Sequence, residues 1–342
     1  MRIEEYRDRI ALTGNEQDRA RFNEIVAQAK SLPIYAGVTG VARLRESVAQ
    51  FADSPLARPP LADVAMTPID ANGVPAWWFR SPSAAREAPI LYFHGGGFVC
   101  GSVQGARGVV SWLVRAFGAP VLAAGYRQGP EHAFPVAVED ARASYTWLVE
   151  HSTEPVTIIG ESAGGALGLL TALHAARSGR RRARAVIAMS AWFDLGMTGA
   201  SWLFNRDKDL VPYELGRFFR DAYLAGVDPQ ASGVSPLNED IADAPPLLIQ
   251  VGSHELALDD AEALVAKARR AGVPVQFEVY SEMPHGFVKF ANPIGDCAIM
   301  RMVEWERASA SGATRGPSSQ RRAGTSERRR SGSKSRVRRP RT

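Results

Sequence analysis

The segment VTIIGESAGGALGLL, residues 156–170, decides how this sequence folds. Its short apolar run predicts a buried strand over 156–160, and its longer Ala- and Leu-rich pattern predicts a helix over 163–178. The turn between them reads Gly160-Glu161-Ser162-Ala163-Gly164, a G-x-S-x-G motif in the strand–turn–helix context that lifts a nucleophilic serine above the edge of a sheet. A glycine-rich turn with a capping serine is the plainer interpretation, and the context favours Ser162 as a nucleophile.

Apolar strand-like runs alternate with helical patterns from about residue 60 to residue 307. Seven further strands are predicted, at 64–69, 75–79, 89–93, 120–126, 184–190, 246–252 and 275–280. Further helices are predicted at 106–117, 136–150, 259–271 and 294–307. This alternation predicts an α/β fold with a mostly parallel, eight-stranded sheet and helices on both faces. In such folds ligands bind beyond the carboxyl ends of the strands, so the chemistry is expected in the loops that follow them.

Three regions depart from this rhythm. Residues 1–55 show helical periodicity and end in the breaker cluster SPLARPP. Residues 196–236 form an aromatic-rich insertion with Trp202, Phe204, Phe218, Phe219 and Tyr223. Residues 308–342 contain almost no apolar side chains and are expected to be disordered, because they cannot bury enough surface to offset the entropy of ordering.

The net charge of +5 is unevenly distributed. Residues 315–342 hold eleven Lys or Arg and one acid, so residues 1–314 carry a net charge of −5. The basic tail could bind nucleic acid through phosphates, and without aromatic residues such binding would be non-specific. We favour an extension without functional contact to nucleic acid.

The composition excludes several classes of protein. No run of about 18 apolar residues is present, so no membrane span is expected, and the charged start MRIEEYRDRI lacks the apolar stretch of a secretory signal. The two cysteines, Cys100 and Cys297, are expected to be free buried thiols in a reducing cytoplasm, with no metal site.

A second glycine-rich turn lies upstream, in PILYFHGGGFVCGS, residues 89–102. Its glycines let the backbone approach a substrate closely, and backbone N–H groups aimed at a developing oxyanion stabilise it. A phosphate-binding loop would need Lys and Ser or Thr at offsets where they are missing. We expect an oxyanion hole from the amides of Gly96, Gly97 and Ala163, with His94 bracing the loop.

His285 is the expected general base. It lies in EVYSEMPHGF, residues 278–287, in a short turn after the last predicted strand, from which an imidazole can reach Ser162. A histidine has a pKa near the working pH and suits this role. The order Ser, acid, His along the chain then places the catalytic acid between residues 162 and 285.

Together these stretches resemble the bacterial hormone-sensitive lipase family of α/β-hydrolases over roughly residues 1–307. The matching segments are HGGGF (94–98), YRQGPEHAFPVAVEDA (126–141), GESAGG (160–165), SAWFDL (190–195), PPLLIQVGSHELALDDA (245–261) and MPHGF (283–287). The resemblance implies a cofactor-free esterase for small-molecule esters with short to medium acyl groups. It also implies a cap built from residues 1–55 and about 196–236 on a catalytic domain of residues 56–307. Two departures, Glu161 for Asp and Gln128-Gly129 for Leu-Ala, bear on substrate fit rather than on chemistry.

The acid is the least obvious site residue, because VGSHELALDD (251–260) offers Glu255, Asp259 and Asp260. Glu255 lies in the loop beyond a predicted strand, whereas the two aspartates open a helix, where acids are favoured anyway. The family pattern Asp-Pro-Leu-x-Asp, laid on the chain without gaps, also puts its first acid on Glu255. We therefore expect a Ser162–His285–Glu255 triad.

The same triad would serve an amidase, carbamate hydrolase or small-molecule deacetylase, which is the main alternative. A non-catalytic ligand-binding relative is less favoured, because His285 is present. Trp77 and Trp78 are expected to alternate across a strand rather than to line the substrate site. The sequence leaves a homodimer open.

Overall fold

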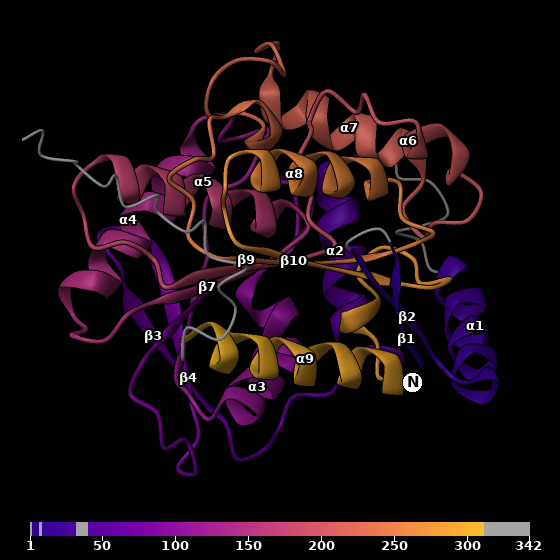
Figure 1. Cartoon of the computed structure of the whole chain (residues 1–342), viewed down its shortest axis with the longest axis horizontal. Helices are drawn as coiled ribbons and strands as arrows, with labels where there is room; N and C mark the ends of the chain where they lie inside the picture. Colours follow the sequence, from indigo (N-terminus) through magenta and orange to yellow (C-terminus); the bar gives the residue numbers. More distant parts are fainter. Residues whose placement is uncertain (1, 7–8, 32–39, 311–342) are drawn as a thin grey trace, which may run out of the picture.

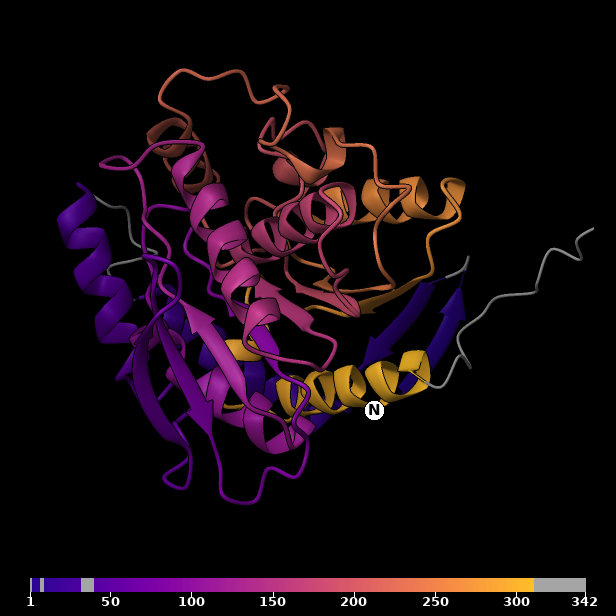
Figure 2. The same ribbon diagram turned by 90° about the vertical axis from the view of Figure 1, so that its left-hand side faces the viewer.

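The computed structural model describes residues 2–6, 9–31 and 40–310. In these residues ten strands form one sheet, in the order β1-β2-β10-β9-β8-β7-β5-β6-β4-β3 (Figures 1 and 2). The strands are β1 (Arg2–Tyr6), β2 (Arg9–Thr13), β3 (Ala65–Asp70), β4 (Pro75–Arg80), β5 (Ile90–Phe93), β6 (Val121–Ala124), β7 (Thr157–Glu161), β8 (Ala185–Met189), β9 (Leu247–Gly252) and β10 (Val275–Tyr280).

All eight predicted strands are present, as β3 to β10, and the predicted number is too low by two. The expectation of helix throughout residues 1–55 is wrong for β1 and β2, which form an antiparallel pair that joins the sheet edge through β10. The free edge of β10 offers unpaired backbone groups, and pairing with β2 satisfies them.

The described helices are α1 (Glu16–Lys30), α2 (Val41–Ala52), α3 (Val103–Phe117), α4 (Val136–Glu150), α5 (Ala163–Arg177), α6 (Ser201–Phe204), α7 (Tyr213–Leu224), α8 (Leu258–Arg270) and α9 (Pro293–Ala310). The five predicted helices correspond to α3, α4, α5, α8 and α9, with ends that differ by at most three residues. Since α9 continues to Ala310, the tail begins later than predicted. The expectations of disorder and of nucleic-acid contact for 311–342 fall outside the described residues.

The sheet has a hydrophobic core on each face. Ile158 and Ile159 are neighbours on β7 and belong to different apolar clusters, because successive side chains of a strand point to opposite faces. Both are fully buried, as expected for a central parallel strand covered by helices. Figure 1 shows the sheet nearly edge-on, with α8 on one side and α3 and α9 on the other. Trp77 and Trp78 also pack against opposite clusters, as predicted.

The pairing from β2 through β10, β9, β8, β7 and β5 to β6 is parallel throughout. The carboxyl ends of these strands therefore meet at one edge. The glycine-rich loop follows β5, the predicted nucleophile follows β7, and the loops with the predicted acid and histidine follow β9 and β10. The topology alone brings four chemically relevant segments to the same place.

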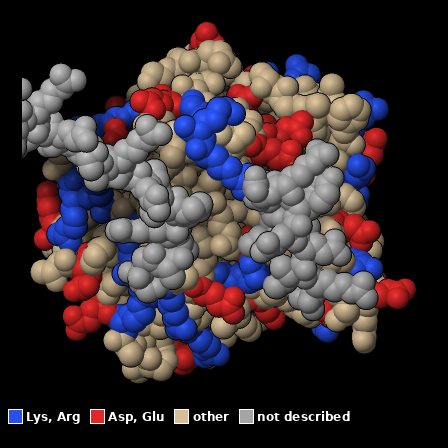
Figure 3. Space-filling model, viewed as in Figure 1, with Lys and Arg blue, Asp and Glu red and all other residues tan. Residues whose placement is uncertain are grey.

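The described surface shows mixed charge. On the face drawn in Figure 3, the basic and acidic side chains of the described residues are interspersed. Among the described helices, none combines the length and apolar character needed to cross a bilayer. The described residues hold no group of three or more His, Cys, Asp or Glu that could bind a metal ion. Both cysteines are free; Cys100 is buried, whereas Cys297 is only partly buried.

Candidate active site

Ser162 lies on a sharp turn between β7 and α5. Its backbone has φ 55° and ψ −121°, a conformation that a residue with a side chain rarely adopts and that the surrounding structure must enforce. The two motif glycines make the turn possible. A Cβ on Gly160 would lie 2.1 Å from the Gly164 carbonyl oxygen, and one on Gly164 would lie 2.1 Å from the Phe93 carbonyl oxygen. A side chain at either position would therefore collide with neighbouring backbone.

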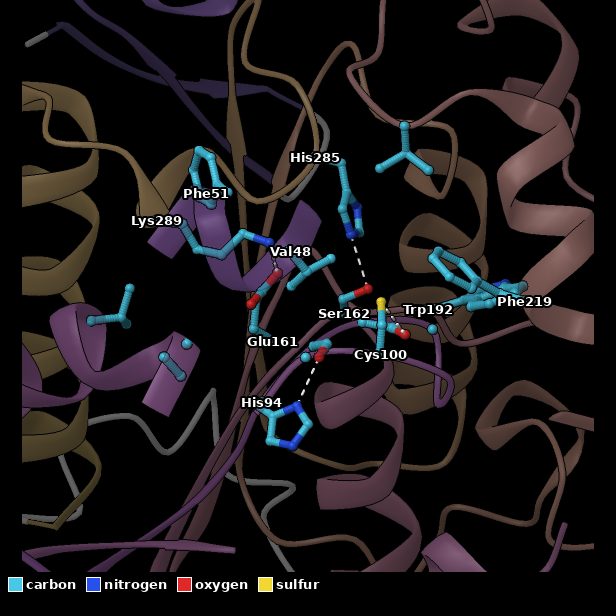
Figure 4. Close-up of a pocket in the computed structure, with 18 of the residues that line it drawn as sticks. Val48, Phe51, His94, Cys100, Glu161, Ser162, Trp192, Phe219, His285 and Lys289 are labelled. Carbon is cyan, nitrogen blue, oxygen red and sulfur yellow. Dashed lines mark hydrogen bonds and ion pairs between the residues drawn. The ribbon is translucent and has the colours of Figure 1, made fainter. Parts of the chain in front are cut away.

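The three side chains predicted for the triad form one hydrogen-bonded chain. The Ser162 hydroxyl lies 2.9 Å from His285 Nε2 (Figure 4). His285 Nδ1 lies 3.2 Å from Glu255 Oε2. This arrangement requires the tautomer with the proton on Nδ1, which donates to Glu255 and leaves Nε2 free to accept from the serine.

Glu255 is completely buried, and both of its oxygens accept hydrogen bonds. Its Oε1 accepts from the Ser190 hydroxyl at 2.7 Å and from the Gly252 amide at 2.6 Å, while Oε2 faces the histidine. Ser190 Oγ in turn accepts from the Gly286 amide at 3.1 Å. These hydrogen bonds hold the carboxylate with Oε2 toward the imidazole.

The surroundings keep His285 basic. Its burial by itself lowers the pKa, but the hydrogen bond and charge of Glu255, together with the charge of Asp209, raise the pKa above its ordinary value of 6.5. The net direction follows from two nearby anions that stabilise the imidazolium. A base with a pKa raised in this way accepts a proton from a serine more readily.

The two competing acids have other partners. Asp259 Oδ2 accepts from the Ser201 amide, and Asp260 Oδ1 accepts from Trp202 Nε1. In the described part of the chain neither carboxylate is hydrogen-bonded or ion-paired to His285. Burial raises the pKa of Asp260 well above its ordinary range, which disfavours a charge there. Both aspartates attach α6 to the start of α8.

The glycine-rich loop presents free amides beside Ser162. Gly96 has φ 122° and Gly97 has φ 60°, and within the described residues their N–H groups have no hydrogen-bond acceptor. The Ala163 amide opens α5, where no carbonyl of the preceding turn is available to it. These three N–H groups could therefore donate to an oxygen of a bound substrate.

His94 holds this loop in shape. Its Nδ1 lies 2.8 Å from the Gly95 carbonyl oxygen, and its ring stacks on Tyr126, whose hydroxyl donates to the His94 carbonyl oxygen. Burial lowers the pKa of His94 to about 4, so the ring is neutral at neutral pH. These contacts are those of a bracing residue.

The departure at Gln128-Gly129 also contributes to the loop. Gln128 Nε2 donates to the carbonyl oxygens of Cys100 and Gly101, at 3.0 and 2.9 Å. A Cβ on Gly129 would lie 2.9 Å from the Ala222 carbonyl oxygen, so glycine lets α7 approach. The pair supports the site without contacting the reacting groups.

A cavity of about 130 Å³ opens at Ser162. Figure 4 shows Trp192 and Phe219 on one side of the serine, with Val48 and Phe51 from α2 on the other. Trp202, Leu215 and Leu256 complete the apolar wall. Of the aromatic residues in the insertion, only Trp202 and Phe219 line this cavity; Tyr223 stacks on Phe98, and Phe204 and Phe218 are exposed.

A charged pair lies at the base of the site. Glu161, directly before the serine, is buried and forms an ion pair with Lys289, at 2.9 Å between Nζ and Oε1. A Cβ on Gly95 would lie 2.9 Å from the Glu161 carboxylate. The pair thus links the end of β7 to the segment just after His285, and the absence of a side chain at Gly95 gives it room.

Sequence reasoning missed Asp209, Ser190 and Lys289. Ser190 opens the segment SAWFDL and directly follows β8, and this position at the same sheet edge was an available signal. Asp209 lies in the insertion and Lys289 in a short 3₁₀ turn, and no spacing in the sequence relates either residue to the serine.

Comparison with known proteins agrees with this geometry. The model of the alpha/beta hydrolase fold family matches residues 90–289. An acetyl-hydrolase of Streptomyces hygroscopicus is 43% identical over 215 residues, which cover 61% of this chain and 71% of that protein. An ethyl acetate hydrolase of Pseudomonas putida is 27% identical over 84% of this chain and 96% of its own length.

Solved structures extend the likeness to three dimensions. The crystal structure of an esterase from the bacterial hormone-sensitive lipase family superimposes with a TM-score of 0.80 and 34% identity, over 86% of this chain and 99% of that one. Residues 90–289, which the family model matches, include the serine, the glutamate and the histidine. This chain therefore belongs to the α/β-hydrolase fold family and, within it, to the bacterial hormone-sensitive-lipase-like esterases.

Proposed function

We propose that this carboxylic ester hydrolase acts on short to medium acyl esters through Ser162, His285 and Glu255, with a covalent acyl-enzyme intermediate. The observation that carries the proposal is the continuous hydrogen-bond chain from the Ser162 hydroxyl through the imidazole to a fully buried carboxylate. The serine end of this hydrogen-bond chain lies beside the amides of Gly96 and Gly97, which have no acceptor among the described residues.

In the first half of the reaction, Ser162 Oγ attacks the ester carbonyl while His285 Nε2 takes the hydroxyl proton. The carbonyl oxygen becomes an oxyanion that accepts from the amides of Gly96, Gly97 and Ala163. Collapse of this intermediate breaks the bond to the alcohol, which leaves with the proton from His285. Glu255 stabilises the imidazolium throughout.

In the second half, a water molecule gives a proton to His285 and attacks the acyl-serine carbonyl. The new oxyanion collapses, the acid leaves, and the proton returns to Ser162. No cofactor takes part in these steps. The N-terminus of α5, which carries a partial positive charge, begins directly after Ser162 and favours both oxyanions.

We further propose that residues 1–55, with the exception of the β1–β2 pair, form a cap over the catalytic domain of residues 56–307 together with about 196–236. Val48 and Phe51 come from α2, and Leu215 and Phe219 come from α7, and all four line the cavity. Contributions from both segments to one wall support this division. The β1–β2 pair belongs to the sheet rather than to the cap.

The cavity sets an expectation for acyl length. At about 130 Å³ it is smaller than the roughly 300–1,000 Å³ typical of sites for drug-sized ligands. We expect kcat/KM for p-nitrophenyl esters to be highest between two and about six acyl carbons. At twelve carbons it should fall by roughly tenfold or more, because overpacking costs about 1–3 kcal/mol. A profile that rises steadily to sixteen carbons would contradict the proposed substrate class.

The reaction type is tested by labelling and by matched substrates. A p-nitrophenyl ester of an alkylphosphonate should inactivate the enzyme by transferring one phosphonyl group to it, with release of p-nitrophenol. Mass spectrometry should find this group on Ser162. Turnover of p-nitrophenyl acetate and of p-nitroacetanilide, measured together, separates an esterase from an amidase or deacetylase. Faster turnover of the anilide would favour that alternative, and labelling at another residue would refute the nucleophile.

The oxyanion loop is tested by a variant and its rescue. A Cβ on Gly97 would lie 2.3 Å from the Phe219 ring, so Gly97→Ala should push the loop away and lower kcat/KM by roughly 10²-fold. Alanine tolerates the backbone at φ 60° at a cost of about 1–2 kcal/mol. Phe219 Cβ also lies 2.7 Å from that position and would remain in an alanine variant, so the rescue uses glycine. The double variant Gly97→Ala/Phe219→Gly should recover much of the lost kcat/KM relative to Phe219→Gly alone.

Gly96→Ala is the matched control for this rescue. A Cβ on Gly96 would lie 2.1 Å from the Cys100 carbonyl oxygen, which is backbone and stays in place when Phe219 is truncated. Phe219→Gly should give no rescue there. Equal rescue at both glycines, or at neither, would show that the loop geometry described above does not govern turnover.

A further inference from the structure

One buried carboxylate joins the two loops that carry Glu255 and His285. Asp209 is only 5% exposed. Its Oδ1 accepts from the backbone amide of His285 at 2.7 Å, and its Oδ2 accepts from the amide of Leu256, the residue after Glu255, at 2.8 Å. The Leu210 amide also donates to Oδ1, at 2.7 Å. A single side chain thus fixes the backbone at both members of the pair that must face each other.

Asp209 comes from the insertion rather than from a strand end. It follows α6 on a turn that begins at Asn205, whose carbonyl oxygen accepts from the Asp209 amide. Asn205 Nδ2 donates to the carbonyl oxygens of Ser253 and Glu255, at 3.1 and 2.9 Å. The two side chains of this turn therefore hold the acid loop by its amides and by its carbonyls. The insertion both lines the cavity and supports the groups beneath it.

A carboxylate suits this position better than an amide would. Both loop amides need an acceptor, and a carboxylate offers one oxygen to each, whereas an asparagine has a single acceptor oxygen and would place an NH₂ group against the second N–H. A buried donor left without a partner is costly. The charge also matters, because the charged groups that face His285 are Glu255, Asp209 and Lys289, and both acids favour the imidazolium.

We propose that Asp209 is a positioning residue for catalysis. It fixes the loops of Glu255 and His285 relative to each other and attaches them to the cap. This proposal rests on the triad proposed above. Because Asp209 contacts only the backbone of these loops, it acts through the histidine and the glutamate rather than on the substrate. Displacement of a catalytic group by about 1 Å can lower a rate by about 10²-fold, which sets the size of the expected effect.

The test compares Asp209→Asn with Asp207→Asn in the full chain. Asp207 lies on the same turn and is exposed, with an ion pair to Arg206 at the surface. For Asp209→Asn we expect kcat on p-nitrophenyl acetate to fall by about 10²-fold with little change in KM. Asp207→Asn should leave both constants near those of the wild type.

The pH profile separates positioning from a merely structural role. Activity needs neutral His285, so kcat/KM rises as the pH rises through the pKa of this histidine. Loss of the Asp209 charge lowers that pKa, since the charge raises it in the wild type. The acid limb of the Asp209→Asn profile should therefore move to lower pH, and that of Asp207→Asn should stay. A variant damaged only in stability would keep the wild-type limb.

The outcomes are distinguishable from failure of the triad proposal. If the Ser162→Ala variant remains active, the triad proposal is refuted. If a folded Asp209→Asn variant keeps the wild-type kcat and its acid limb does not move, only the role of Asp209 is refuted. If Asp209→Asn does not fold, Asp209→Ser replaces it, because serine brings no amide and leaves room for water at both N–H groups. Failure of both variants to fold would assign Asp209 to folding and overturn the proposal.

Discussion

Replacement of Ser162 by alanine is expected to lower kcat by about 10⁶-fold, which is the typical cost of removing the nucleophile from a serine triad. The variant keeps the cavity and the amides of Gly96 and Gly97, so substrate binding and oxyanion stabilisation remain while the covalent route is lost. A residual rate about 10³-fold above the uncatalysed reaction should therefore persist. The measurement is kcat for p-nitrophenyl acetate on protein purified free of host esterases.

The matched control lies on the same helix. Ser178 caps the far end of α5, is exposed, and bonds only weakly to the Ala175 carbonyl oxygen, at 3.4 Å. Ser178→Ala should retain full activity. The interpretation would be wrong if Ser162→Ala kept more than about a hundredth of the wild-type kcat, since the lost interaction acts in every turnover.

The histidine provides a second check on the same step. Since Ser162 and His285 act as one unit, His285→Ala should cost about as much as Ser162→Ala, and the double variant should be little slower than either single one. Additive losses would mean that the two side chains act separately. Such a result would conflict with the 2.9 Å contact between them.

The sequence predicted the strands, and the meeting of Ser162, Glu255 and His285 at one sheet edge, for a physical reason. Local patterns determine them: the turn of Gly160 to Gly164 needs glycines at fixed offsets, and the loop after each parallel strand reaches the same edge whatever covers the faces. Glu255 could be separated from Asp259 because one lies in a loop and the other opens a helix, which the structure places at α8.

What sequence reasoning missed depends on tertiary packing. Asp209 reaches Leu256 and His285 across 47 and 76 residues, and nothing within its own loop marks it among the nearby charged residues. Lys289 meets Glu161 only because β7 and β10 end at the same edge. Strands β1 and β2 were not predicted, because their pairing depends on the open edge of β10 rather than on an apolar pattern of their own.

Glu255→Gln is expected to lower kcat by about 10⁴-fold, because an amide at this position favours the wrong tautomer of the histidine. Ser190 and the Gly252 amide donate to one oxygen of Glu255, so the oxygen of a glutamine would be held there. Its NH₂ group would then face His285 Nδ1, which must accept rather than donate. The proton would move to Nε2, where it blocks proton transfer from the serine.

The two aspartates are the controls for this assignment. Asp259→Asn and Asp260→Asn alter contacts to Ser201 and Trp202, so each should keep kcat within roughly tenfold of the wild type. The pH profile adds a second readout: Glu255→Gln removes the hydrogen bond and charge that raise the pKa of His285, so the remaining activity should have its acid limb at lower pH. If Asp260→Asn abolished turnover while Glu255→Gln stayed active, the acid would be Asp260, and the imidazole would have to turn away from the carboxylate it faces here at 3.2 Å.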